Sequence, residues 1–301
     1  MDPKKSFERD GYVFVPGLLA PQEAAKYRAE IQKLSGVGDA DFRDKLFECP
    51  DGVSKNRAFW PVIFNQKLLA TLRQILGPTV RYTQHSDLHA HRTGGWHRDC
   101  ACRNYGQGPD WTPSAHPYHV VRVAIYLQSY AESGSSLGII PGSHRPQRPL
   151  PRFGIRAWSK YLRTMRQLRG NSEEDQRRDK DFPWIQTVDH GLPLIGWPAL
   201  PVWFRTEPGD AVIFDQRCYH CASDITGPKY AIYLSYSPDD EHASNHLYYY
   251  THVRRDLKYG QLDPELVEQL KQAGLYCEPH FKPEQEAILR EFCHAPVAGS
   301  Y

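Results

Sequence analysis

The stretch Gly95-Trp96-His97-Arg98-Asp99 decides how this sequence is interpreted. One residue separates His97 from Asp99, and residues i and i+2 of a β-strand point to the same face. An imidazole and a carboxylate on one face can hold a metal ion from one side. A distant imidazole, His220 at the end of Phe214-Asp215-Gln216-Arg217-Cys218-Tyr219-His220, would complete three ligands. Two His and one carboxylate leave coordination positions open, which suits non-haem Fe(II) and its oxygen chemistry.

A His-x-Asp tripeptide is a weak signal by itself, because the chain contains 14 His residues. Taken alone, such a tripeptide is more often a solvated or hydrogen-bonded pair than a metal site. A second copy occurs at His85-Ser86-Asp87, on a segment where four ligand-type residues would share one strand face: His85, Asp87, His89 and His91. That row is either a polar face at the mouth of a cavity or part of a metal site, and the residues alone leave both interpretations open.

The size and charge of the chain limit the kinds of partner. Its 301 residues suffice for one large domain or two small ones. Hydrophobic residues make up 40% of the chain, and no apolar run approaches the length of a transmembrane helix. A formal net charge of +2 gives no reason to expect a nucleic acid or a membrane as partner. The first residues lack the apolar segment of a secretory signal, so we expect a cytoplasmic protein.

The cysteines allow a different kind of site. Seven Cys residues in a chain without an export signal are expected to be reduced thiols. Alternatively, Cys100-Ala101-Cys102 could combine with Cys218 and Cys221 into a four-cysteine zinc site. The first spacing is tight for zinc, and both pairs lie beside the proposed His ligands. A zinc-stabilised interaction domain is therefore a further alternative.

The rest of the chain predicts a mainly β fold with flanking helices. Apolar residues at helical spacing predict helices that begin at Pro21, after Asn65, at Pro264 and at Pro283. β-rich segments are expected at residues 12–15, 80–91, 119–128, 202–204, 211–215 and 230–237. Many short strands between turns favour a β-barrel or a two-sheet jelly roll with helical buttresses. Such a fold offers His97, Asp99 and His220 a common mouth.

One long segment differs in composition. Residues 152–180 are dominated by charged residues, with a helix expected around residues 157–168. We expect a single domain over residues 1–301, in which residues 145–200 form an insertion that acts as a lid. A solvated surface helix is the simpler alternative for the charged part.

Four passages of the chain resemble, in the expected order, the phytanoyl-CoA dioxygenase family of Fe(II)/2-oxoglutarate-dependent oxygenases. They are Phe7–Glu23, read as Phe-x-x-x-Gly-Tyr-Val-Phe-Val-Pro-Gly-Leu-Leu-x-Pro-x-Glu, then Trp96-His97-x-Asp99, Gly138-Ile-Ile-Pro-Gly-Ser-His144, and Pro208–His220. Their joint occurrence is specific. It favours His97 and Asp99 over the copy at His85-Ser86-Asp87.

The resemblance implies a double-stranded β-helix (jelly-roll, cupin-like) core. His97, Asp99 and His220 would bind Fe(II), with 2-oxoglutarate as co-substrate and O2 as oxidant. Oxidative decarboxylation to succinate and CO2 would be coupled to oxidation, by default hydroxylation, of a small or medium polar metabolite. Asp99 argues against a halogenase, in which this carboxylate is replaced. The alternative is a non-catalytic or metal-independent ligand-binding protein on the same fold.

The chain departs from the family where 2-oxoglutarate is held. The family usually has an Arg after the distal His, paired with the far carboxylate of the co-substrate, and this chain has Lys229. Lys is a point charge and cannot clamp a carboxylate with two parallel hydrogen bonds. Gln84 stands roughly where some relatives contact 2-oxoglutarate. Arg122 is the rival cation and could instead bind the substrate, for which we also expect contacts from Trp96 and Tyr126.

Overall fold

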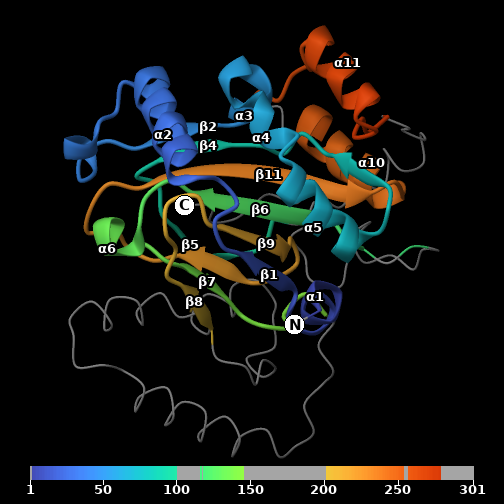
Figure 1. Cartoon of the computed structure of the whole chain (residues 1–301), viewed down its shortest axis with the longest axis horizontal. Helices are drawn as coiled ribbons and strands as arrows, with labels where there is room; N and C mark the ends of the chain where they lie inside the picture. Colours follow the sequence, from blue (N-terminus) through green and yellow to red (C-terminus); the bar gives the residue numbers. More distant parts are fainter. Residues whose placement is uncertain (1, 100–115, 117, 146–200, 254–256, 279–301) are drawn as a thin grey trace, which may run out of the picture.

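The computed structural model describes residues 2–99, 116, 118–145, 201–253 and 257–278, which contain two antiparallel β-sheets (Figure 1). The helices are α1 (Pro3–Asp10), α2 (Pro21–Ser35), α3 (Gly52–Lys55), α4 (Trp60–Ile63), α5 (Gln66–Leu76), α6 (Tyr130–Ser133), α10 (Glu241–Tyr248) and α11 (Pro264–Gln272). Shorter helical segments are η1 (Asp39–Asp41), η2 (Arg57–Phe59) and the π-helical η3 (Tyr249–Val253). The strands are β1 (Tyr12–Val15), β2 (Phe47–Cys49), β3 (Val80–Tyr82), β4 (Leu88–Ala90), β5 (Gly94–His97), β6 (Val121–Tyr126), β7 (Leu137–Ile139), β8 (Val202–Phe204), β9 (Ala211–Asp215), β10 (His220–Ala222) and β11 (Tyr230–Pro238).

The larger sheet is built around β11. Its order is β1-β9-β6-β11-β4-β2, and β3 also pairs with β11. The pairing of β6 with β11 runs from Ala231 opposite Tyr126 to Tyr236 opposite Val121. These strands are rich in β-branched and aromatic residues, which pack well on a pleated surface.

The two faces of the larger sheet have different partners. One face carries Val123, Ile125, Ile232 and Leu234, which pack with apolar residues of the helices in one hydrophobic cluster. In Figure 1, α2, α3 and α4 lie above this sheet, whereas β5, β7 and β8 lie below it. The opposite face joins the smaller sheet in a second cluster: Ala124, Tyr126, Leu137, Ile139, Phe204, Val212, Phe214, Cys218 and Ala231. Side-chain alternation therefore separates a helix-covered face from an inter-sheet interior.

The smaller sheet has the order β5-β10-β7-β8. Its β10 pairs with β5 so that His220 lies opposite His97, and the register shifts between His220 and Ala222. On the other side His220 lies opposite Ile139 of β7. This pairing brings residues that are far apart in the sequence to one edge of the inter-sheet space.

The first turn of the chain depends on a glycine. Gly11 ends α1 with φ of +83°, a region that favours glycine. A Cβ atom here would lie 2.5 Å from both Cys218 Sγ and His144 Nδ1. The backbone of β1 therefore lies directly against the loop that leads to His220.

The structure confirms the mainly β jelly-roll fold with flanking helices, and it confirms several element boundaries. α5 begins after Asn65, whose Oδ1 accepts a hydrogen bond from Leu68 N at 3.0 Å, and α11 spans Pro264–Gln272 as expected. Residues 80–91 form two strands rather than one, because the backbone turns at Gln84 (φ 59°). The expectation that His91 shares the face of His89 is wrong: His91 has φ 58° and donates from Nε2 to Gly38 O.

Other expectations concern residues outside the described ranges. They are the helices at residues 157–168 and 283–292 and the lid at residues 145–200, all but residue 145 of it. The division of the chain into one domain with an insertion stays a prediction. Within the described residues, no helix has the length and apolar character needed to cross a membrane.

Candidate metal centre

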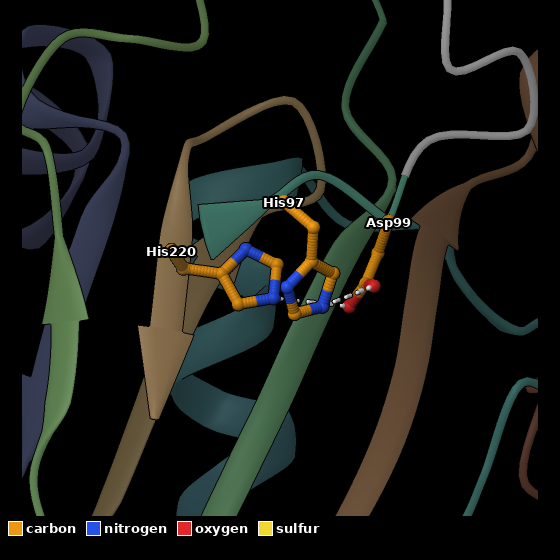
Figure 2. Close-up of side chains that lie close together, drawn as sticks. All are labelled: His97, Asp99 and His220. Atoms are coloured by element: carbon orange, nitrogen blue, oxygen red, sulfur yellow. Dashed lines mark ion pairs between the residues drawn. The ribbon is translucent and has the colours of Figure 1, made fainter. Parts of the chain in front are cut away.

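His97, Asp99 and His220 converge at the edge of the two sheets (Figure 2). His97 ends β5, His220 begins β10, and their ring centroids are 4.3 Å apart. His97 Nε2 lies 3.4 Å from Asp99 Oδ1, and His220 Nε2 lies 3.5 Å from Asp99 Oδ2. One ligand atom from each residue lies within 4.8 Å of the others. Among the described residues this is the one group of His, Cys, Asp or Glu side chains so arranged.

Backbone carbonyls fix the tautomer of both imidazoles. His97 Nδ1 lies 2.6 Å from Gly95 O, and His220 Nδ1 lies 3.0 Å from Cys218 O. A carbonyl oxygen only accepts, so each Nδ1 carries a hydrogen, and the neutral form of each ring has its lone pair on Nε2. Both lone pairs belong to the nitrogens nearest Asp99. This is the arrangement that a divalent metal ion requires of neutral His ligands.

The charges of the group also suit a cation. Burial opposes ionisation of Asp99, but His220 and His97 outweigh it and hold the pKa of Asp99 well below its usual value. Burial, with His97 nearby, lowers the pKa of His220. The site therefore presents an ionised carboxylate, and the lowered pKa of His220 favours the neutral form of that imidazole. The side chain of His97 is 41% exposed and that of His220 only 6%, so the group opens toward solvent on the β5 side.

The backbone of Asp99 is held from two further segments. Its N–H donates to Gln216 O at 2.9 Å, and Tyr250 Oη lies 3.4 Å from its carbonyl oxygen. Gln216 precedes β10, and Tyr250 belongs to η3. These contacts connect the carboxylate ligand with the His220 loop and with the C-terminal helical region.

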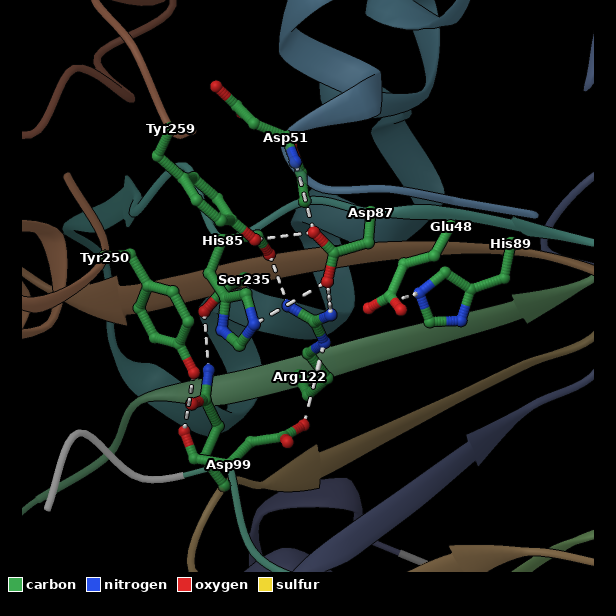
Figure 3. A network of polar contacts seen from close by, with 12 residues as sticks. Glu48, Asp51, His85, Asp87, His89, Asp99, Arg122, Ser235, Tyr250 and Tyr259 are labelled. Atoms are coloured by element: carbon green, nitrogen blue, oxygen red, sulfur yellow. Dashed lines mark hydrogen bonds and ion pairs between the residues drawn. The ribbon is translucent and has the colours of Figure 1, made fainter. Parts of the chain in front are cut away.

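A buried polar network adjoins Asp99 (Figure 3). Arg122 of β6 forms an ion pair with Asp87, donates from Nη1 to His85 O at 2.6 Å, and places Nε 3.8 Å from Asp99 Oδ2. Asp87 also accepts from Tyr259 Oη at 2.5 Å. Burial opposes the charge of Asp87, yet Arg122 keeps the pKa of this carboxyl far below its usual value. The second His-x-Asp copy is thus a partner of Arg122.

A wall of imidazole and phenol rings continues from this network. His85 stacks on Tyr250 with ring centroids 3.7 Å apart, and its Nδ1 lies 3.2 Å from His246 Nε2. Burial, followed by the charge of Arg122, lowers the pKa of both imidazoles, that of His246 to about 3. Both rings are therefore neutral, hydrogen-bonding surfaces beside Asp99.

Lys229 is a buried cation whose Nζ makes few polar contacts among the described residues. It is 1% exposed, and its Nζ donates to Arg92 O at 2.6 Å. Burial lowers its pKa to about 8, with Cys221 and Arg92 as smaller influences. In the described part of the chain it forms no ion pair with a carboxylate. Its parity along the chain is that of Ala231 and Tyr233, which belong to the inter-sheet cluster.

The structure places the remaining predicted site residues as follows. Tyr126 is 1% exposed in the inter-sheet cluster, and its pKa is raised by burial and by Tyr233. Gln84 donates from Nε2 to Asp51 Oδ2 at 2.8 Å and to Gly260 O at 2.7 Å, so its amide joins two loops. Trp96 lies in β5, and its side chain is not among the described ones.

Sequence reasoning missed the contributions of the C-terminal segment. Tyr250 and Tyr259 come from segments that follow β11, and His246 comes from α10. The aromatic run Tyr248-Tyr249-Tyr250 was the available signal. In the folded chain Tyr250 of this run stacks on His85 and lies beside the Asp99 carbonyl.

The cysteine alternative is tested in half of its residues. Cys218 and Cys221 are buried and belong to different hydrophobic clusters. Burial raises the pKa of the Cys218 thiol, which disfavours the thiolate that zinc requires. Cys100 and Cys102 lie outside the described residues.

Comparison with known proteins points in the same direction as the geometry. A family model described as Phytanoyl-CoA dioxygenase (PhyH) matches residues 7–231. The protein named ectoine dioxygenase from Streptomyces avermitilis is 26% identical over 242 residues, which cover 74% of this chain and 73% of the relative. The ectoine dioxygenase from Nocardia farcinica is 24% identical over 247 residues, 77% of this chain and 76% of the relative.

The crystal structure of HygX from Streptomyces hygroscopicus with nickel and 2-oxoglutarate bound is similar with a TM-score of 0.50. It is 18% identical, and the match covers 77% of this chain and 84% of that chain. At this identity the likeness shows the shared fold.

Proposed function

The chain belongs to the phytanoyl-CoA dioxygenase family and is an Fe(II)/2-oxoglutarate-dependent dioxygenase, and we propose that it hydroxylates a small or medium polar metabolite at a centre formed by His97, Asp99 and His220. One observation carries the proposal. Two imidazoles, each held at Nδ1 by a backbone carbonyl, direct Nε2 toward one ionised carboxylate, and the three ligand atoms lie within 4.8 Å of one another. Three such ligands leave the other positions of an iron ion open.

When bound there, Fe(II) supplies the oxidation chemistry, in which 2-oxoglutarate and O2 yield succinate, CO2 and an oxidised substrate. The chain's own residues prepare that chemistry. Gly95 O and Cys218 O orient the imidazoles of His97 and His220, and Gln216 O positions the backbone of Asp99. The hydrophobic cluster between the sheets excludes water from the interior behind the ligands.

Lys229 is our candidate for the far carboxylate of 2-oxoglutarate. A buried ammonium that donates to one carbonyl retains hydrogens for a second acceptor. A carboxylate beside it would favour the charged form and raise the pKa from about 8. A single ammonium makes a less directional contact than the two-pronged clamp of an arginine. A contact of Gln84 with the co-substrate stays a prediction.

A polar substrate fits the surroundings of Asp99. His85, His246 and Tyr250 offer neutral rings that stack and form hydrogen bonds. The relatives named ectoine dioxygenase carry a small polar molecule in their names, which supports the same class of substrate for this chain. Trp96 and Tyr126 remain predicted substrate contacts.

The decisive experiment measures succinate formed from labelled 2-oxoglutarate in the presence of candidate polar metabolites. We expect succinate release that depends on Fe(II) and rises with the true substrate. Asp99→Ala should remove it while the far-ultraviolet circular dichroism stays unchanged. A non-catalytic binding protein on this fold, which the family relationship does not favour, would instead release no succinate under any condition.

A further inference from the structure

Arg122 lies between two carboxylates and is closer to one of them than to the other. Its Nη2 is paired with Asp87, whereas its Nε lies 3.8 Å from Asp99 Oδ2, beyond hydrogen-bond distance. The side chain is 5% exposed, and Nε has no hydrogen-bond partner among the described residues. A small movement would therefore bring this buried guanidinium into hydrogen-bond contact with Asp99, the carboxylate that we assign to the metal.

Several contacts keep the guanidinium on the Asp87 side. Asp87 Oδ1 accepts from Tyr259 Oη at 2.5 Å and from Asp51 N at 3.1 Å, so this carboxylate is fixed from two loops. His85 O accepts a hydrogen bond from Arg122 Nη1 at 2.6 Å. The Tyr233 ring lies 5.2 Å from the guanidinium carbon and packs against one face. The position of Arg122 is therefore set by groups that are not metal ligands.

We propose that Asp87 is a positioning residue of the metal centre: by holding Arg122, it keeps the guanidinium from pairing with Asp99 and so leaves that carboxylate free for the metal ion. The proposal rests on the function proposed above. The physical reason is competition. A guanidinium and a carboxylate prefer a two-pronged pair that occupies both oxygens, and a metal ion needs one of those oxygens.

The proposal predicts the sign of one substitution. Asp87→Asn removes the charge that holds Arg122 and changes the side-chain volume little. Arg122 should then turn to Asp99, and the dissociation constant for Mn²⁺, measured by electron paramagnetic resonance without 2-oxoglutarate, should rise about tenfold or more. A tenfold change corresponds to about 1.4 kcal/mol, well below the usual effect of a buried charge pair.

A second substitution distinguishes positioning from simple structural damage. In the double variant Asp87→Asn with Arg122→Gln, both charges of the pair are gone and no guanidinium remains to compete. Mn²⁺ affinity should return to within about threefold of the unmodified protein, a factor worth well under 1 kcal/mol. A purely structural role of the pair predicts the reverse, because the double variant loses more contacts than the single one.

A matched control exists on the other face of the larger sheet. Arg28 also pairs with two carboxylates, Asp39 at 2.8 Å and Glu132 at 2.6 Å, and also packs on a β11 ring, that of Tyr230. Arg28→Gln should leave Mn²⁺ affinity unchanged. An equal loss in this variant would mean that any lost arginine pair loosens the metal site, and it would overturn the proposal.

The remaining outcomes distinguish a failure of the positioning role of Asp87 from a failure of the metal site. If Asp87→Asn binds Mn²⁺ as tightly as the unmodified protein, or if the double variant stays as weak as the single one, the positioning role is wrong and the metal site stands. If Asp99→Ala binds Mn²⁺ normally, the site itself is wrong and the positioning role falls with it. Should Asp87→Asn fail to fold, the pair Asp87→Asn/Arg122→Lys and Asp87→Asn/Arg122→Gln gives the same comparison, with weaker binding expected in the lysine variant.

Discussion

His97 and His220 stand opposite each other in the pairing of β5 with β10, and their ring centroids are 4.3 Å apart. The two rings are inclined at 51°. A pairing register, set by backbone hydrogen bonds, thus determines where the two nitrogen donors meet. The predictions below follow from this placement and from the buried charges around it.

Replacing a metal ligand should abolish turnover. His220→Ala removes one of two nitrogen donors, and we expect succinate release to fall by more than about a hundredfold, beyond the loss typical of residues that only support a ligand. The measurement is succinate formed at saturating Fe(II) and 2-oxoglutarate. His252→Ala, which removes an exposed imidazole of η3, is the control and should retain activity. Wild-type turnover by His220→Ala would show that the ligand set is wrong.

Lys229 should determine the affinity for 2-oxoglutarate. Lys229→Ala removes the proposed partner of its far carboxylate, and loss of one member of a buried charge pair costs about 2–5 kcal/mol. The apparent KM for 2-oxoglutarate should rise at least about thirtyfold, the low end of that range. Lys67→Ala is the control, because Lys67 Nζ also donates to backbone carbonyls, those of Pro16 and Gly17, but is exposed. Arg122→Ala should mainly weaken the prime substrate, and the reverse pattern would move the anchor to Arg122.

The same residue predicts a pH dependence. Burial lowers the pKa of Lys229 to about 8, so the free enzyme loses this charge as the pH rises through 8. Binding of a carboxylate requires the charged form, hence KM for 2-oxoglutarate should rise about tenfold per pH unit above 8 and stay flat below it. In Lys229→Arg the guanidinium stays protonated, and the rise should disappear. An identical rise in that variant would assign it to another group.

The loop before His220 should depend on a buried ion pair. Arg217 Nη2 lies 2.8 Å from Asp215 Oδ2, Asp215 is fully buried, and Arg217 also donates to Tyr118 O at 2.8 Å. Asp215→Ala leaves the guanidinium without its carboxylate, and the free energy of unfolding should fall by about 3–5 kcal/mol. Urea denaturation measures this loss. Glu265→Ala, which breaks an exposed pair with Arg57, should cost no more than about 1 kcal/mol.

Acid should weaken that pair in a defined direction. Burial opposes the charge of Asp215, but Arg217 outweighs it and lowers the pKa of the carboxyl. A lowered folded-state pKa contributes stability that is present above the unfolded-state value, about 4, and is lost as the pH falls through the folded-state value. The stability difference between the unmodified protein and Asp215→Asn should therefore be constant at neutral pH and shrink only below about pH 4. Shrinkage already at pH 6 would indicate a different group.

The sequence was informative where one periodicity or one short motif determines the outcome. The alternation in residues 230–237 predicts β11, and the Asn65 cap predicts the start of α5. His97, Asp99 and His220 could be found because the ligand types lie at fixed spacing in strand context. Contacts between residues far apart in the sequence could not be predicted from such motifs. The partners of Arg122 come from residues 85 and 87, and Tyr259 joins them from far downstream, so only the folded chain reveals the network.

Backbone conformation explains the other difference between expectation and structure. Residues 80–91 read as one polar strand, but Gln84 and His91 adopt positive φ and divide the segment. Neither Gln nor His by itself indicates a positive φ. Gln84 is held there by Asp51 and Gly260, which are contacts from distant loops.

The acceptors of the two imidazoles have one more consequence. Gly95 and Cys218 each stand two positions before the histidine that they orient. Each ligand therefore forms a self-contained tripeptide unit, whose geometry is inherited with three consecutive residues. Residues elsewhere in the barrel can be exchanged during evolution, and specificity can diverge, without rebuilding the support of either nitrogen. A designer could likewise transplant the two tripeptides onto another pair of adjacent antiparallel strands as a portable half of a metal centre.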